Sequence, residues 1–118
     1  MPDPIQEMLN NLRSIKGVHG AALIEKFGQV RATSLPGWVD SDATSAMVTL
    51  ILKASERATR ELSQGQFVRA IIENANGKLL FSEVEGKIIV IIATTDAKLG
   101  IINLKLDAAR KVIREAAG

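Results

Sequence analysis

The spacing of apolar and polar positions along this chain changes repeatedly and divides it into eight predicted elements. Three segments have apolar residues every three or four positions, which predicts amphipathic helices. They are residues 4–15, residues 40–62 and the segment from residue 96 onward. Five shorter segments are β-prone and bounded by turn residues, which predicts strands. They are residues 18–25, 30–35, 67–73, 78–84 and 87–94.

The last predicted strand is apolar on both sides, because residues 88–92 read Ile-Ile-Val-Ile-Ile without a polar break. A strand of this kind is covered on both faces, so we expect it near the centre of the sheet with helices above and below. Short turns join most of the strands, and Asn76-Gly77 is the strongest hairpin signal. The pattern therefore predicts an α+β fold with an antiparallel sheet between two helical layers.

The helix predicted at residues 40–62 has more apolar surface than one contact can cover. One stripe at helical spacing consists of Ala43, Met47, Leu50, Ile51, Ala54, Ala58 and Leu62. Val48 and Leu52 lie off this stripe, beside small polar residues. We expect the stripe to face the core and the off-stripe pair to face a second surface, most simply another copy of the chain. Ordinary exposure of two aliphatic side chains is the alternative.

Composition narrows the class of protein without pointing to a charged partner. The 118 residues fit one domain spanning 1–118, and 24% charged with 47% hydrophobic residues is a globular balance. A net charge of +2 gives little support for nucleic-acid binding. The chain has no Cys, its N-terminus does not resemble a secretion signal, and no apolar run reaches the ~20 residues of a membrane span. We expect a cytoplasmic protein that does not insert into membranes.

Residues that could carry chemistry are few and scattered, which predicts a protein that is not an enzyme. His19 is the only histidine, and a lone histidine is more often structural than a ligand or base. A helix cap explains Asp40 and Asp42 better than an acid–base pair does. The sequence contains no GxxxxGK(S/T) motif and no GxGxxG motif after a strand, which are the two glycine-rich motifs that bind phosphate groups. No serine lies in a nucleophile elbow. We expect no catalytic residue, no metal and no cofactor.

Two features allow more than one interpretation. Trp38, the only tryptophan, either caps the core beneath the long helix or serves as an anchor for a partner. Arg57 and Arg60 fit ion pairs with Glu61 and Glu56, respectively, on the same helix. The alternative for these arginines is a charge offered to a bound nucleotide, as an arginine finger offers it.

The whole chain resembles the Roadblock/dynein light chain family. The likeness rests on element order together with several short stretches, none of which is specific alone. They are residues 15–21 (Ile-Lys-Gly-Val-His-Gly-Ala), Phe27-Gly28, residues 32–36 (Ala-Thr-Ser-Leu-Pro), Glu56-Arg57-Ala58, Glu61-Leu62, the strand pair around Gly77, and Leu99-Gly100.

This resemblance implies both an architecture and a role. The family fold is a three-layer α/β/α sandwich with a five-stranded antiparallel sheet in the order 2-1-5-4-3. The long helix lies on one face and the other two helices lie on the opposite face. Family members form homodimers or heterodimers through their third strands and long helices. Some are non-catalytic scaffolds that bind Ras-like small GTPases through the paired helices.

Transferred to this sequence, the resemblance implies two sets of interaction residues. The helix seam and partner platform would comprise Ser45, Val48, Thr49, Leu52, Lys53, Ser55, Glu56 and Thr59. Strand pairing between protomers would use Val68, Arg69, Ala70, Ile71 and Ile72. The partners would be a second copy of the chain and a Ras-like small GTPase.

Three alternatives to this role come from other classes of protein. A small-molecule sensor would need a cavity lined by the sheet, against which an aromatic content of only 3% argues mildly. Nucleic-acid binding would use Lys105, Arg110, Lys111 and Arg114 on the last helix, but aromatic residues are not interleaved with them. A purely architectural dimer without a GTPase is the third.

Overall fold

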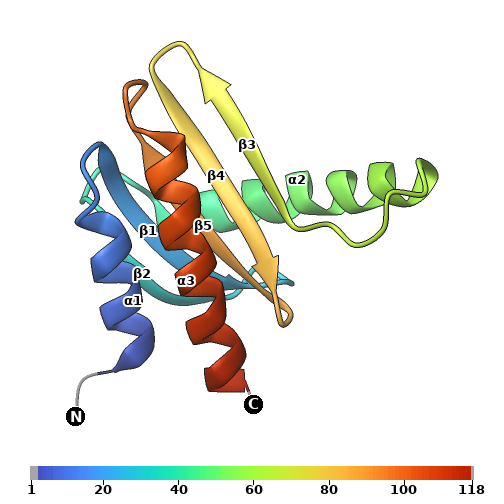
Figure 1. The fold of residues 1–118 in the computed structure, drawn as a ribbon, viewed down its shortest axis with the longest axis horizontal. Coiled ribbons are helices and arrows are strands. Elements are labelled where there is room, and N and C mark those ends of the chain that lie inside the picture. Colours follow the sequence, from blue (N-terminus) through green and yellow to red (C-terminus); the bar gives the residue numbers. More distant parts are fainter. Residues whose placement is uncertain (1–2, 118) are drawn as a thin grey trace.

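The computed structural model describes residues 3–117, so residues 1, 2 and 118 of the expected domain lie outside the described part. It contains the predicted three helices and five strands in the predicted order (Figure 1). Their bounds are α1 Pro4–Arg13, β1 Val18–Glu25, β2 Val30–Ser34, α2 Ser41–Glu61, β3 Arg69–Asn74, β4 Gly77–Val84, β5 Lys87–Ala93 and α3 Leu99–Ala117.

The five strands form one antiparallel sheet in the order β2-β1-β5-β4-β3, as the family resemblance implied. The central strand β5 pairs with β1 on one side and with β4 on the other, so that Ile91 lies opposite both Ala21 and Leu80. Helices α1 and α3 lie side by side on one face of the sheet, and α2 crosses the other face (Figure 1). The predicted three-layer fold class is therefore confirmed.

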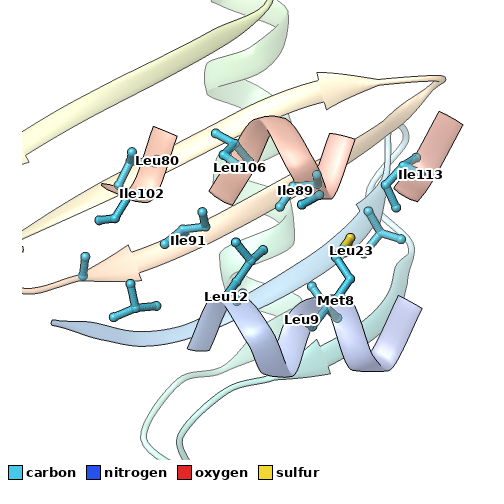
Figure 2. Packing of buried hydrophobic residues seen from close by; sticks show 14 of the residues in the cluster. Met8, Leu9, Leu12, Leu23, Leu80, Ile89, Ile91, Ile102, Leu106 and Ile113 are labelled. Atoms are coloured by element: carbon cyan, nitrogen blue, oxygen red, sulfur yellow. The ribbon is translucent and has the colours of Figure 1, made fainter. Parts of the chain in front are cut away.

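Alternation along β5 explains why both faces carry helices. Ile89 and Ile91 belong to the core beneath α1 and α3, whereas Ile88 and Val90 belong to the core beneath α2. Figure 2 shows the first of these cores, in which side chains from α1 and α3 converge on the sheet. An apolar side chain that leaves water contributes about 1.5–3 kcal/mol. The apolar run in β5 thus stabilises both layers at once.

The predicted start is correct for α2 but not for α3. The Asp40 side chain accepts a hydrogen bond from the Ala43 amide at 3.0 Å and caps α2 as expected. The last helix begins at Leu99, three residues later than its predicted start at residue 96. The Asp96 carboxylate instead accepts a hydrogen bond from the Thr94 hydroxyl, which lowers the pKa of Asp96 below its ordinary value. A local side-chain bond thus occupies the residue that the pattern assigned to the helix start.

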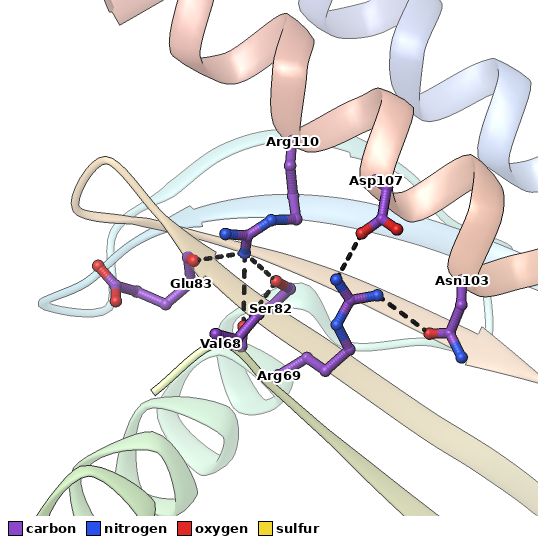
Figure 3. A network of polar contacts seen from close by, with 7 residues as sticks. All are labelled: Val68, Arg69, Ser82, Glu83, Asn103, Asp107 and Arg110. Atoms are coloured by element: carbon purple, nitrogen blue, oxygen red, sulfur yellow. Dashed lines mark hydrogen bonds and ion pairs between the residues drawn. The ribbon is translucent and has the colours of Figure 1, made fainter. Parts of the chain in front are cut away.

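Arg110 joins α3 to the sheet through three acceptors (Figure 3). Its Nη1 donates to the Glu83 carbonyl at 2.7 Å, to the Ser82 hydroxyl, and to the Val68 carbonyl at 3.4 Å. The Ser82 hydroxyl in turn donates to the Val68 carbonyl at 2.7 Å. Because Ser82 and Glu83 are buried, few other donors can reach these oxygens. The arginine therefore holds the chain before β3 against both β4 and α3.

Arg69 makes a second connection between β3 and α3. Its guanidinium donates to the Asp107 carboxylate, with which it forms an ion pair, and to the Asn103 side chain at 3.2 Å (Figure 3). The hydrogen bond from Arg69 holds the pKa of Asp107 below its ordinary value. The Arg69 side chain is thus engaged within its own protomer, although its backbone belongs to β3.

We expect Arg110→Ala to lower the free energy of unfolding by about 1.5–3 kcal/mol, because it leaves the buried Glu83 carbonyl without its charged donor. Arg114→Ala is the matched control, since Arg114 is exposed one turn later on the same helix. It should change stability by less than about 0.5 kcal/mol. Urea unfolding followed by circular dichroism measures both variants. Equal losses would show that the Arg110 contacts do not stabilise the fold.

Candidate protein-interaction site

The side of α2 that faces the sheet is the one that the sequence pattern placed outside. Val48 and Leu52 are buried against the sheet, with Leu52 fully inaccessible to solvent. Ser45 and Thr49 are buried on the same side. The expectation that Val48 and Leu52 would be exposed is therefore wrong. These four residues of the expected platform are covered by the protomer's own sheet.

Hydrogen bonds explain why the side of α2 that carries Ser45 and Thr49 can face the sheet. The Ser45 hydroxyl donates to the Gly28 carbonyl in the turn between β1 and β2, and the Thr49 hydroxyl donates to the Ser45 carbonyl at 2.7 Å. Both polar groups are thus satisfied when buried, which removes most of the penalty for desolvation. Their small size also lets the helix lie close to the glycine turn.

The opposite side of α2 exposes the apolar stripe predicted for the core. We call this set the outer stripe; it consists of Ala43, Met47, Leu50, Ile51, Ala54, Ala58 and Leu62. All of them are exposed except Ile51, which is half-buried, and Leu50 keeps 66% of its surface accessible. The helix does have apolar residues on two sides, as predicted, but the two sides are exchanged. Three large side chains of the outer stripe, Met47, Leu50 and Leu62, therefore face outward.

The C-terminal half of α2 projects beyond the sheet. Figure 1 shows the helix passing the edge strand β3 and continuing away from the other elements. The buried residues of α2 accordingly end at Leu52. Of the remaining expected platform residues, Ser55, Glu56 and Thr59 are half-buried and Lys53 is exposed. These four lie where a partner can reach the helix.

Ion pairing on α2 differs from the predicted pattern. Glu56 bonds to Lys26 at 2.9 Å instead of to Arg60, and this contact raises the pKa of Lys26 above its ordinary value. Arg57 and Arg60 are exposed, and neither belongs to an ion pair among residues 3–117. The interpretation that Arg60 pairs with Glu56, or Arg57 with Glu61, is therefore wrong.

The edge strand β3 adds a second unpartnered surface next to α2. It pairs with β4 on one side, and no strand of the described chain pairs with its other side. Ile71 and the preceding Val68 are exposed, while Ala70 and Ile72 are half-buried against the α2 core. A free strand edge with apolar side chains can pair with another chain.

Two exposed aromatic side chains flank α2. Trp38 contacts His19 edge-to-face at a centroid distance of 5.4 Å and remains exposed, so its predicted role as a core cap is wrong. Phe27 is 88% exposed in the β1–β2 turn, whose Gly28 contacts Ser45 of α2. The sequence interpretation used Phe27 only as part of a turn. The sequence did contain a sign that Phe27 is exposed: this aromatic residue precedes Gly28 in a turn between two predicted strands, and neither strand can cover a side chain at the turn.

Within the part of the chain that the structure describes, no group of three or more His, Cys, Asp or Glu side chains could hold a metal ion. The same residues include no helix of the length and apolar character that crossing a bilayer requires. Arg110, one of four residues considered for nucleic-acid binding, is half-buried in the contacts with Val68, Ser82 and Glu83. The apolar surfaces of α2 and β3 are therefore the candidate site.

Comparisons with known proteins agree with this architecture. The Roadblock/LC7 domain profile matches residues 4–94. The uncharacterized protein MJ1340 of Methanocaldococcus jannaschii is 30% identical over 110 residues, which cover 93% of this chain and 96% of that protein.

Solved structures show the same fold at lower identity. A Roadblock/LC7 domain from Streptomyces avermitilis has a TM-score of 0.88 at 15% identity, covering 95% of this chain and 96% of that one. Myxococcus xanthus MglB has a TM-score of 0.89 at 17% identity, covering 95% of this chain and 93% of that one. The profile match and the sequence relative show that this chain belongs to the Roadblock/LC7 domain family.

Proposed function

We propose that this chain is a non-catalytic scaffold that forms a homodimer and binds a Ras-like small GTPase through its paired α2 helices. The observation that carries the proposal is the outer stripe of α2, an apolar surface that extends along a helix projecting from its own domain. Contiguous apolar surface of this kind marks interaction sites in soluble proteins.

Two neighbouring features support self-association as the first step. The outer stripe and the β3 edge lie on adjacent elements, so one two-fold interface could cover both. Pairing through residues 68–72 would extend the sheet and remove its apolar edge. Because the Arg69 side chain is held by Asp107, its contribution to such pairing would come from the backbone.

The GTPase part of the proposal rests on family membership and on the surface left after dimerisation. Lys53, Ser55, Glu56 and Thr59 stay in the predicted platform because each is accessible at least in part. Phe27 joins them as a proposed anchor, since exposed aromatic side chains often dominate binding energy at protein interfaces. Trp38 remains a second aromatic anchor for a partner.

Leu50→Arg should weaken the homodimer by about tenfold or more while leaving the protomer folded, because Leu50 is exposed on the outer stripe. Leu104→Arg is the matched control: Leu104 is 69% exposed, but it lies on α3 at the other face of the sheet. Sedimentation equilibrium measures dimerisation, and circular dichroism measures folding. A Leu50→Arg protein that dimerises like the Leu104→Arg protein would contradict the assignment.

Leu52→Arg should behave differently from Leu50→Arg, although only one residue separates the two positions. Leu52 is fully buried, so the substitution would place a charged guanidinium in the core beneath α2. We therefore expect the free energy of unfolding to fall by more than about 4 kcal/mol. Thermal unfolding tests this. An unfolding temperature equal to that of the wild-type protein would show that α2 turns its other side to the sheet.

Phe27→Ala should reduce binding of a Ras-like small GTPase by at least about fivefold without changing dimerisation. The test uses purified small GTPases from the source organism, loaded with GDP or with a non-hydrolysable GTP analogue, in biolayer interferometry. Leu50→Arg should reduce the same binding because it removes the paired platform. If the wild-type dimer forms but binds none of these GTPases, the chain is an architectural dimer.

A further inference from the structure

The face of the sheet opposite α2 carries a groove that contains no residue of the proposed dimer seam or GTPase platform. It lies between α1 and α3 and has a volume of about 1020 Å³. Helix α3 falls outside residues 4–94, which match the family profile. The groove is lined by Met8, Asn11, Leu12, Ser14, Ile15, Lys16, Gly17, Asp96, Lys98, Ile101, Lys105, Ala108, Ala109 and Val112.

The groove has an apolar floor and a basic rim. Met8, Leu12 and Ala109 form buried parts of its lining, while Ile101 is 47% exposed. Three lysines line it, at positions 16, 98 and 105, against one carboxylate, Asp96. None of these lysines belongs to an ion pair among the residues that the structure describes. The charge and the apolar surface together favour an acidic partner that also has an apolar side.

The shape of the groove favours a helical partner over a small molecule. Helix α3 forms one wall, and its lining residues extend from Ile101 to Val112; the end of α1 and the loop after it form the other wall. Helices α1 and α3 run antiparallel (Figure 1). The stretch on α3 is about 17 Å long at 1.5 Å per residue, enough for about three turns of another helix. None of the lining residues is aromatic, although aromatic side chains are common in pockets for small ligands.

One wall of the groove is fixed before any partner arrives. Helix α3 is joined to the sheet by Arg110 and by the Arg69–Asp107 ion pair, both on the side of α3 that faces β3 and β4 (Figure 3). A groove that exists before binding loses less conformational freedom when a ligand enters it. The groove residues on α3 can therefore contact a partner without rearranging the fold.

We propose that this groove binds an acidic amphipathic helix of a partner protein. Apolar side chains of that helix, spaced three and four residues apart, would pack on Ile15, Ile101 and Ala108, which line the groove and are at least partly accessible. Its flanking Asp and Glu side chains would lie near Lys16, Lys98 and Lys105. Because the site lies on the opposite face from α2, it does not overlap the proposed dimer seam.

A displayed library of amphipathic helices of about 15 residues, with fixed apolar positions and random flanking positions, tests the proposal. Selection against the wild-type chain should recover peptides enriched in Asp and Glu at the flanks. Enrichment in Lys and Arg, or recovery of no peptide that binds the purified chain, would overturn the proposal.

Variants with matched controls then place the bound peptide on the protein. Ala108→Arg fills the groove and should weaken binding of a recovered peptide at least about tenfold, whereas Ala116→Arg, exposed near the end of the same helix, should have little effect. Lys105→Glu should weaken binding about fivefold, and Lys111→Glu less than about twofold. Fluorescence anisotropy measures all four variants.

Two controls distinguish a peptide bound in the groove from self-association and from a peptide bound on another surface. All four variants should keep the circular dichroism spectrum and the dimerisation constant of the wild-type chain. If Ala108→Arg abolishes self-association instead, the groove is an interface between copies of this chain and the proposal is wrong. Binding that Ala108→Arg and Ala116→Arg reduce equally would also overturn it, because the peptide would then bind elsewhere.

Discussion

Burial of the sheet on both of its faces is the constraint on which the rest of this structure depends. The central strand β5 has isoleucine or valine on each side, so neither face can be left to water. Two helices cover one face, and α2 alone covers the other. Because α2 is long and its buried residues end at Leu52, the remainder projects past β3. The projecting helix and the free strand edge thus follow from one arrangement.

The packing of α2 shows how buried small polar residues can shape an interaction surface. Ser45 and Thr49 satisfy their hydroxyl groups with nearby carbonyls, so they occupy the inner side at little cost. Bulkier residues such as Met47 and Leu50 then lie outside. A protomer alone in water would bury more apolar surface in the reverse arrangement, because the outer stripe has seven apolar residues and the inner side has only Val48 and Leu52. The observed orientation therefore supports the proposed association through the outer stripe.

Helix α3 contributes both to the groove beside α1 and to the position of the edge strand β3. One side of it lines the groove beside α1, through residues such as Ile101 and Lys105. Another side carries Asp107 and Arg110, which hold Arg69 and the backbone at Val68 next to the edge strand. The same helix thus shapes the proposed docking groove and positions the strand proposed for dimerisation. The polar contacts of α3 hold the edge strand β3 in position, although β3 is less buried than the central strands.

The sequence by itself determined the order of the elements, the family resemblance and the central position of β5, because local periodicity and turn residues encode these directly. It also showed that α2 is apolar on two sides. Only the tertiary structure decided which side is inside, since periodicity is identical for a stripe that faces the core and one that faces solvent. Contacts between distant segments made that choice, namely Ser45 with the Gly28 turn and Leu52 with the sheet. The hydrogen bonds from Arg110 to the Val68 and Glu83 carbonyls likewise join residues far apart in the chain, and no local sequence pattern can reveal them.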